Sequence, residues 1–359
     1  MRAPDYAGGG LVNLVAELEH RLTGSSPAPR LYPQLASTIP EADSYIVVLF
    51  DGLGTGQLEH ANAARLRSDL AASIDASFST QTSVSTATLA TGLPPSRHGL
   101  ISYLLRLPGG VVNTLWWFYS DGSPVEFELS SFLPDPMLGE RLAATGAESV
   151  VVEPAAFMGG PLDQVLFRST RVVGTDGTTE RVSKTLSEAA TPGRLILCYV
   201  PDVDAAAHGE GFGSDSYGAA LTKASGIWDA LANGLPAGAA LVGTADHGMV
   251  QITRHVEVTP PPGLVLAGDG RVLHIHGHPD TAAEFASPLP GTWIPFDEAS
   301  NWWGPGPLHP DFEERAPDSL LIGDEGVSFR HAANSLPLAC EHGGVTEDEL
   351  KIPILIGTR

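Results

Sequence analysis

The sequence predicts an α/β fold with a mostly parallel central sheet, helices on both faces of that sheet and a smaller inserted subdomain. Continuous apolar runs such as residues 45–50 and 195–200 are typical of strands that are buried on both faces, as in parallel sheets. Segments of helical periodicity lie between these runs, and this alternation indicates strand–helix–strand units. A stretch dense in proline and glycine, residues 251–324, interrupts the alternation.

The chain of 359 residues is long enough for about two domains. We expect residues 1–250 and 325–359 to form the core and residues 251–324 to form a β-rich insertion. The expected helices lie at residues 11–22, after residue 52 to about residue 70, and at 137–145, 179–189 and 217–231. The expected strands lie at residues 45–50, 149–152, 195–200, 240–244 and 352–356.

The composition argues against several classes of partner. With 20 basic and 42 acidic residues, the formal net charge of −22 disfavours binding to duplex nucleic acid or to an anionic membrane surface. The chain has no run of 18 apolar residues and no apolar segment after Met1, so we expect a cytoplasmic protein without a membrane span. The two cysteines, Cys198 and Cys340, are too few for a disulfide framework. The composition favours no particular oligomeric state.

Metal-ligating residue types follow several of the expected strands. Ligands of open α/β sheets bind at the carboxyl ends of the strands, so residues at those ends are candidates for a site. The residues concerned are Asp51, Asp204 with His208, Asp246 with His247, and His342 near the end of the chain. Each alone is explained as a turn residue or a helix-surface pair. Because they recur at the same end of successive strands, together they indicate a site for divalent cations, which Asp and neutral His both bind.

A hydroxyl-rich stretch, residues 77–100, supplies candidates for a nucleophile. It contains serines and threonines at many positions and closes in the turn sequence TGLPP at residues 91–95. A hydroxyl is a weak nucleophile unless a base or a metal ion activates it. Taken by itself, the stretch is also explained as the start of a helix with no chemical role.

Taken in order, these motifs resemble the alkaline phosphatase superfamily, and most closely the type I phosphodiesterase/nucleotide pyrophosphatase family. The motifs are the strand ending in Asp51-Gly52, the hydroxyl stretch with its TGLPP turn, Asp204 with His208, Asp246-His247-Gly248 and His342-Gly343-Gly344. They span residues 45–345. Individually they are weak signals, but as an ordered set they are specific.

The resemblance implies two divalent metal ions, zinc or alternatively manganese. One ion would be held by Asp204, His208 and His342. The other would be held by Asp51, Asp246 and His247, with the nucleophile Thr82 as a further ligand. The position of Thr82 follows from counting nine residues back from Thr91, as in the family; Ser83 and then Thr80 are the nearest competitors.

The resemblance further implies a two-metal hydrolase of phosphoric esters that forms a covalent phospho-threonine intermediate. We expect a small phosphate ester as substrate, with a nucleotide as one candidate, and an activity of the phosphodiesterase or nucleotide pyrophosphatase type. The alternatives on the same scaffold are a phosphomonoesterase, a phosphonate hydrolase or a phosphomutase. A non-catalytic binding protein that retains the fold is a further alternative, which the complete set of ligands disfavours.

Two features do not follow the family pattern. The nucleotide pyrophosphatases have an Asn three residues after the nucleophile, where this chain has Ser85, and a Phe-Pro pair where it has Ser83-Val84. These changes put the contacts to the phosphoryl oxygens and the preference for nucleotides in doubt. The run His274, His276 and His278 also has the spacing of a further metal site on a strand, although histidines that line a pocket or lie on the surface explain it as well.

Overall fold

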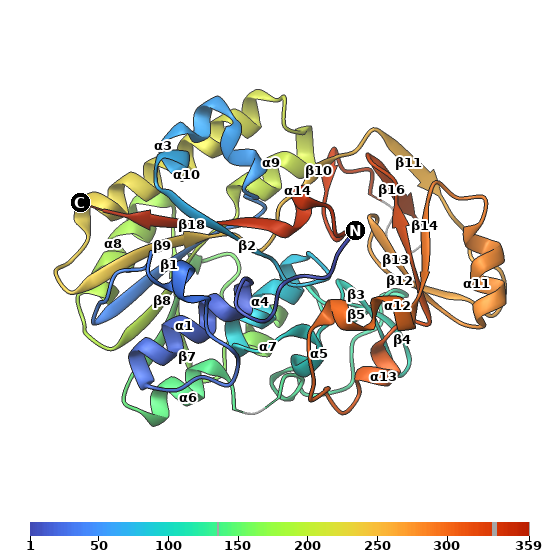
Figure 1. The fold of residues 1–359 in the computed structure, drawn as a ribbon, viewed down its shortest axis with the longest axis horizontal. Coiled ribbons are helices and arrows are strands. Elements are labelled where there is room, and N and C mark those ends of the chain that lie inside the picture. Colours follow the sequence, from blue (N-terminus) through green and yellow to red (C-terminus); the bar gives the residue numbers. More distant parts are fainter. Residues whose placement is uncertain (135, 332–335, 359) are drawn as a thin grey trace.

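A mixed sheet of seven strands forms the centre of the molecule (Figure 1). The computed structural model describes residues 1–134, 136–331 and 336–358. The strands of this sheet, in spatial order, are β2 (Leu70–Asp75), β18 (Lys351–Gly357), β9 (Ala239–Thr244), β1 (Ser44–Phe50), β8 (Arg194–Val200), β6 (Glu148–Pro154) and β7 (Thr170–Thr175).

The five strands from β9 to β7 are parallel, as expected for β9, β1, β8 and β6 from their apolar runs, whereas β7 was not predicted. Helices cover this part of the sheet on its two faces (Figure 1). On one face lie α1 (Leu11–Thr23) and α6 (Leu138–Ala144), and on the other lie α8 (Thr178–Ala189) and α10 (Asp215–Gly234). Each parallel strand therefore ends at the same edge of the sheet, which is where the candidate residues lie.

The β18 edge of the sheet is antiparallel, which the sequence analysis did not anticipate. Strand β18 pairs antiparallel with both β9 and β2. It follows the four-residue helix α14 (Glu347–Leu350) directly, so the chain enters it from the carboxyl edge of the sheet. A parallel strand needs a long crossover connection to return to the other edge, and no crossover is present here.

Strand β2 was also not predicted, and the helical pattern expected before it is broken. Residues 56–68 form two 3-10 turns and the short helix α3 (Ala64–Ser68) instead of one helix. The ring of His60 accepts a hydrogen bond from the backbone N–H of Asn62 at 3.2 Å, so one turn ends and the next begins at this residue.

A second sheet lies beside the first and supports the other side of the site (Figure 1). It contains strands from the expected insertion and also three strands from residues 104–119, which the sequence analysis left unassigned. In spatial order they are β14 (Gly291–Pro295), β15 (Ser319–Gly323), β13 (Val272–His276), β12 (Val265–Gly268), β3 (Leu104–Leu107), β4 (Gly110–Asn113) and β5 (Phe118–Tyr119). The independence of residues 251–324 as a subdomain stays a prediction.

Short elements connect the two sheets. The two-stranded pairs are β10 (Val250–Gln251) with β17 (Cys340–Glu341) and β11 (Arg254–Glu257) with β16 (Val327–Arg330). The helices around the site are α4 (Thr82–Thr91), α7 (Pro161–Leu166) and α9 (Asp202–Glu210). The remaining helices are α2 (Pro33–Ala36), α5 (Pro95–His98), α11 (Pro279–Ala286), α12 (Phe296–Ala299) and α13 (Phe312–Arg315).

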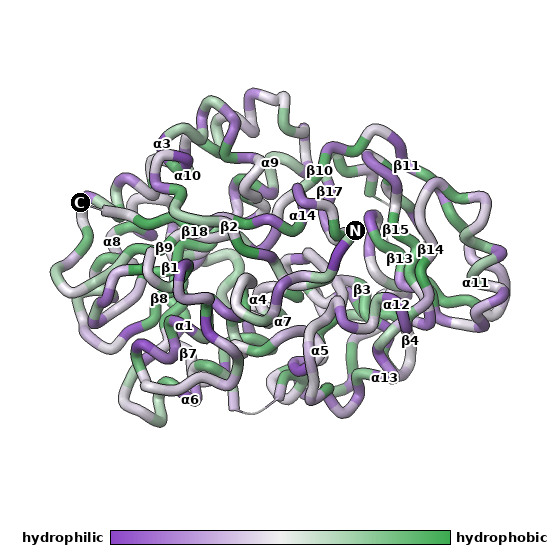
Figure 2. The backbone as a smooth tube through the Cα atoms, viewed as in Figure 1, coloured by the Kyte–Doolittle hydropathy of each residue, from purple (hydrophilic) through white to green (hydrophobic). Residues whose placement is uncertain are grey.

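The largest hydrophobic core lies on both faces of the central sheet, where β1 is buried along its full length. Figure 2 shows hydrophobic residues concentrated along β1, β8 and β9. A second buried cluster, which includes Phe78 and Trp303, fills the space between α4 and the second sheet. Among the described residues, no helix combines the length and the apolar character that crossing a membrane requires.

Candidate active site

The seven residues singled out in the sequence come together at the carboxyl edge of the central sheet. Asp51 follows β1, and Asp246 and His247 follow β9. Asp204 and His208 lie on α9, the helix after β8, and His342 follows β17. Thr82 is the first residue of α4. The parallel strands place the first three groups side by side, because their carboxyl ends meet at one edge.

The first group of side chains consists of Asp204, His208 and His342. Asp204 and His208 are four residues apart on α9 and so share one face of the helix. The Oδ1 atom of Asp204 is 3.2 Å from Nε2 of His208 and 3.7 Å from Nε2 of His342. The two histidine Nε2 atoms are 3.2 Å apart. One cation at this point would reach all three side chains.

The second group consists of Asp51, Asp246 and His247. The Nε2 atom of His247 is 3.6 Å from Oδ1 of Asp51 and 3.3 Å from Oδ2 of Asp246. The Thr82 hydroxyl lies 3.1 Å from the same Nε2 atom. The ring of His247 stacks on the ring of His342 with 3.6 Å between centroids, so the two groups are contiguous. His247 is also within reach of Asp204 and His342.

The three histidines are oriented by backbone carbonyl groups. The Nδ1 atom of His208 lies 2.7 Å from the carbonyl oxygen of Cys340, and that of His247 lies 3.1 Å from the oxygen of Gly248. The Nδ1 atom of His342 lies 2.8 Å from the carbonyl oxygen of Thr80. Because a carbonyl only accepts, each Nδ1 must carry the hydrogen. In its neutral form each ring therefore turns the lone pair of Nε2 toward the site, as metal-ligating histidines do.

The three aspartates present buried oxygens that make no hydrogen bond within the described part of the chain. These are Oδ1 of Asp51, Oδ1 of Asp204 and Oδ2 of Asp246. The ion pairs found for these carboxylates in the described residues are to histidines. Unpaired buried carboxylates are costly, so an arrangement of this kind needs cations from outside the chain.

The pKa shifts of the site residues agree with a need for cations. Burial raises the pKa of Asp51 well above its usual range, and the charges of Asp246 and Asp204 raise it further. Burial lowers the pKa of His208, but the adjacent Asp204 carboxylate outweighs burial and raises it. A proton on His208 thus takes the place of the cation in the metal-free chain. Metal binding would release that proton, as expected for ligands that bind metals in their deprotonated form.

Two neighbouring residues fix the position of Asp51. Gly52 has a φ of +72°, and a Cβ atom there would lie 3.0 Å from Cα of Asp204, so only glycine lets these two segments approach. The hydroxyl of Tyr199, at the end of β8, donates a hydrogen bond to Oδ2 of Asp51. The sequence analysis missed Tyr199, although the alternation along β8 places it on the same sheet face as Leu49 and near Asp51.

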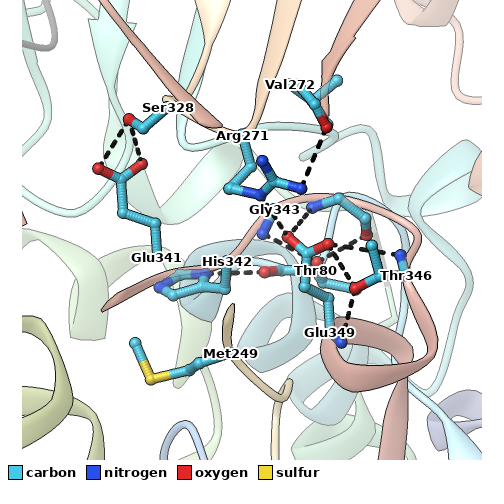
Figure 3. Close-up of polar contacts among 12 residues, drawn as sticks. Thr80, Met249, Arg271, Val272, Ser328, Glu341, His342, Gly343, Thr346 and Glu349 are labelled. Carbon is cyan, nitrogen blue, oxygen red and sulfur yellow. Dashed lines mark hydrogen bonds and ion pairs between the residues drawn. The ribbon is translucent and has the colours of Figure 1, made fainter. Parts of the chain in front are cut away.

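The hydroxyl of Thr80 is engaged in holding the loop that carries His342 (Figure 3). It donates to the carbonyl oxygen of Gly344 at 2.9 Å and accepts the N–H of Gly343 at 2.9 Å. The same loop is held from below by Glu349, whose carboxylate accepts the N–H of Gly344 at 2.9 Å. Next to His342, the carboxylate of Glu341 is bound by the hydroxyl of Ser328 (Figure 3).

The hydroxyls of Ser83 and Ser85 are also engaged elsewhere. The Oγ atom of Ser83 accepts a hydrogen bond from Thr114 at 2.8 Å. The hydroxyl of Ser85 donates to the backbone carbonyl of Asp246 at 2.7 Å and is fully buried. Ser85 therefore ties α4 to the end of β9 and is not directed at a substrate oxygen. Of the candidate nucleophiles, Thr82 is the one whose hydroxyl contacts the histidine and aspartate cluster.

The run His274, His276 and His278 is not brought into the cluster. His274 and His276 are buried in β13, whereas His278 is exposed at the start of α11. The Nε2 atom of His274 lies 3.4 Å from the Ser79 hydroxyl, and its ring meets Trp303 edge-on. Within the described residues, neither group of metal-ligating side chains includes these histidines. His274 and His276 are therefore part of the buried interior of the second sheet, and His278 lies on the surface.

Two cavities open next to Thr82 and Asp204. The larger, of about 550 Å³, lies over the sheet face that carries Tyr199 and is mainly apolar. The smaller, of about 230 Å³, lies on the side of His208 and His342 and is lined by polar groups that include Gln81, Asp269 and Glu341. A substrate whose reacting atom lies at Thr82 would thus extend a group into each cavity.

Fold and site together define an α/β protein of the alkaline phosphatase superfamily, with histidine and aspartate clusters at the carboxyl edge of its sheet. The model of the family "Type I phosphodiesterase / nucleotide pyrophosphatase" matches residues 45–344. The chain belongs to this family. Family and fold support a hydrolase of the phosphoesterase or pyrophosphatase type. No curated protein has a sequence that matches this chain.

Solved structures with the same fold include two kinds of protein. One is murine ectonucleotide pyrophosphatase/phosphodiesterase 5, in an inactive variant bound to AMP, with a TM-score of 0.66, 19% identity and coverage of 86% of this chain and 87% of that chain. The other is phosphonoacetate hydrolase from Sinorhizobium meliloti 1021 in complex with phosphonoacetate, with a TM-score of 0.64, 17% identity and coverage of 89% and 91%. At this level of sequence identity, the similarity to these two proteins shows a shared fold.

Proposed function

We propose that this protein is a two-metal phosphodiesterase of the nucleotide pyrophosphatase type that acts through a phospho-threonine at Thr82. The observation that carries the proposal is the orientation of the histidines: their three Nε2 atoms face three buried carboxylate oxygens that make no hydrogen bond within the described residues, and the Thr82 hydroxyl lies 3.1 Å from one of those nitrogens. Neutral imidazoles and carboxylates in this arrangement are ligands for divalent metal ions.

The donor set fits two ions. Asp204, His208 and His342 would hold one, and Asp51, Asp246 and His247, with Thr82, would hold the other. Mixed nitrogen and oxygen donors suit zinc, with manganese as the alternative. When bound, such ions supply Lewis-acid stabilisation of the phosphoryl oxygens and lower the pKa of a bound hydroxyl or water.

Thr82 is well placed to act as the nucleophile. As the first residue of α4, it lies at the positive end of a helix, where the backbone N–H of Ser83 is available to a phosphoryl oxygen. In the first step the hydroxyl loses its proton, Oγ1 bonds to phosphorus and the bond to the departing alcohol breaks. In the second step water adds to phosphorus, the bond to Oγ1 breaks, and Thr82 regains a proton. The products are an alcohol and a phosphate monoester.

The cavities favour a diester over a monoester. A group on each side of the phosphorus atom would be accommodated, one in the 550 Å³ cavity and one in the 230 Å³ cavity. A monoester or a small phosphonate would leave the larger, apolar cavity unfilled and would gain no binding energy from it.

A paired rate assay tests this proposal. The purified protein, loaded with zinc and separately with manganese, is given bis(p-nitrophenyl) phosphate and p-nitrophenyl phosphate under identical conditions. We expect the diester to be hydrolysed with the higher kcat/KM. A preference for the monoester would assign the protein to the phosphatase or mutase branch, and a metal-loaded protein inactive on both esters would contradict the proposed function.

A further inference from the structure

The floor of the 550 Å³ cavity is one face of the central sheet. Side chains two residues apart on a strand point to the same face, and the cavity is lined by Val151 and Glu153 of β6 and by Leu197 and Tyr199 of β8. Strands β6 and β8 pair in parallel, so Glu153 lies beside Tyr199 at the carboxyl edge. A carboxylic acid thus stands in an otherwise apolar floor, close to Asp51 and Thr82.

Glu153 forms an acid pair with Asp163 of α7 within this cavity. Glu153 is only 4% exposed; Val151 and Leu197 of the lining are apolar, and the hydroxyl of Tyr199 beside it donates to Asp51 instead. The carboxyl groups of Glu153 and Asp163 share a hydrogen bond, yet Oε1 of Glu153 makes none within the described residues. Arg181 acts on Glu153 through its charge, but this buried carboxyl oxygen still lacks a hydrogen-bond donor among the described residues.

The charges of Glu153, Asp163 and Arg181 do not cancel when both acids are ionised, so one more positive charge would balance them. Burial raises the pKa of Glu153 to about 8, and the charge and hydrogen bond of Asp163 contribute, while the charge of Arg181 lowers it in part. Arg181 is buried and is not part of the cavity lining. The pair thus retains a proton at neutral pH, because Arg181 compensates only one of its two charges. A cation in the cavity would take the place of that proton.

Aromatic side chains surround the same space. Phe157 and Tyr199 lie with 6.1 Å between ring centroids, and Trp116 completes the wall on the solvent side. Trp116 is 59% exposed and Phe157 is 42% exposed, although both are large and apolar. Aromatic walls beside a carboxylate are the usual environment in which proteins bind ammonium groups. By contrast, neither cavity beside Thr82 is lined by a lysine or arginine among the described residues, so nothing in the linings would neutralise a second phosphate.

We propose that the ester group held in this cavity carries an organic cation, an amine or quaternary ammonium, whose charge lies against Glu153 and Asp163. This inference rests on the proposed phosphodiesterase activity and specifies its substrate class. Glu153 and Asp163 are then specificity-determining residues. Within the proposed type of activity, a diester with a cationic group is favoured over a nucleoside polyphosphate, because no Lys or Arg among the described residues lines either cavity.

Two substrates of equal shape but different charge test directly whether the cavity prefers a cation. The zinc-loaded protein is given p-nitrophenyl phosphorylcholine and the p-nitrophenyl phosphodiester of 3,3-dimethylbutanol, in which carbon replaces the ammonium nitrogen. Both release the same p-nitrophenol, so kcat/KM differs only through the group in the cavity. We expect a preference of about tenfold or more for the choline ester, in line with the strength of desolvated cation–aromatic contacts. Equal kcat/KM values would overturn the proposal.

Variants of the acid pair test whether Glu153 and Asp163 cause the preference for the choline ester. Glu153→Gln and Asp163→Asn should each reduce the ratio of the two kcat/KM values to about threefold or less, while Glu126→Gln, which removes a carboxylate from an exposed position, should leave the ratio unchanged. Asp163 is only partly buried, so Asp163→Asn provides the test if the Glu153 variant does not fold. If the ratio of the two kcat/KM values is unchanged in Asp163→Asn, the acid pair does not determine the preference for the charged ester.

The test also separates this inference from the proposed activity. If neither ester is hydrolysed, the phosphodiesterase proposal fails, and calorimetric titration with the two intact esters still measures the preference by binding. Tighter binding of the choline ester by about tenfold would support the cation site without the activity. Equal binding of both esters would reject the cation site.

Discussion

The Nε2 atoms of His208 and His342 face each other at 3.2 Å, while both Nδ1 atoms lie within hydrogen-bond distance of backbone carbonyls. With both Nδ1 atoms donating, the two Nε2 atoms would direct lone pairs at one another unless a cation lies between them, either a proton on His208 or a metal ion. Asp204, 3.2 Å from His208, adds a negative charge to the same point. The backbone of α9 and of the loop after β17 thus holds these side chains in an orientation that favours a cation.

Removal of the Thr82 hydroxyl should abolish turnover without unfolding the protein. Thr82→Ala is expected to lower kcat by about 10³-fold or more, because the nucleophile itself is lost, and to keep its zinc content and melting temperature. Thr82→Ser, which retains a hydroxyl, is the matched control and should keep measurable activity. Near-normal kcat in Thr82→Ala would exclude Thr82 as the nucleophile.

Metal removal should lower both activity and stability. We expect two zinc ions per chain by elemental analysis and about one in His342→Ala, since that variant lacks a ligand of one group. A ligand that binds only the folded state at 100 times its Kd stabilises it by about 2.7 kcal/mol, so treatment with a chelator should lower Tm. Zinc contents near zero in the native protein after incubation with excess zinc would contradict this prediction.

Tyr199 should control metal affinity from outside the ligand set. Its hydroxyl donates to Asp51, and loss of such supporting hydrogen bonds costs about 10- to 100-fold in metal affinity. Tyr199→Phe is expected to weaken zinc binding by this amount in a competition titration with a chromogenic chelator. Tyr217→Phe is the control, because the Tyr217 hydroxyl is also buried but contacts none of the seven site residues. Equal zinc affinity in the two variants would show that the Tyr199 bond has no influence.

A buried histidine should make the fold sensitive to acid. Burial lowers the pKa of His98 from 6.5 to about 3, so between these values the unfolded chain binds a proton that the folded chain excludes. The stabilisation is therefore complete above pH 6.5 and is lost by about 1.4 kcal/mol per pH unit as the pH falls toward 3. His98→Gln should be less stable at pH 8, because Leu100 and Thr88 lose hydrogen bonds, but its stability should fall less steeply.

Urea unfolding of the metal-free native chain and of His98→Gln at pH 8, 6 and 5 measures this slope. Chelation keeps the metal ligands from adding their own protons to the comparison. Parallel curves for the two chains would mean that folding does not lower the pKa of His98.

Local sequence was sufficient for four of the five parallel strands of the central sheet, and only β7 was not predicted. The apolar runs of β1, β8 and β9 and the periodicity of α1 and α10 are strong signals, because each element buries a continuous face. Strand β2, with the sequence LAASID, was missed because it is neither uniformly apolar nor strictly alternating. The β3–β5 strands were missed for a different reason: they pair mainly with one another, and with lengths of 4, 4 and 2 residues they are too short for a periodic pattern to stand out.

The sequence by itself determined which residue types could make a metal site, since Asp and His recur where strands end and in a recognisable order. Only the tertiary structure decided how they could act together. The carbonyls of Thr80, Gly248 and Cys340 select the histidine tautomers, and no sequence pattern encodes those contacts. The acid pair of Glu153 and Asp163 likewise exists only because β6 and α7 fold against the same cavity. The type of each side chain is set by the sequence, but its orientation, its burial and the charges around it depend on residues that are distant in the chain.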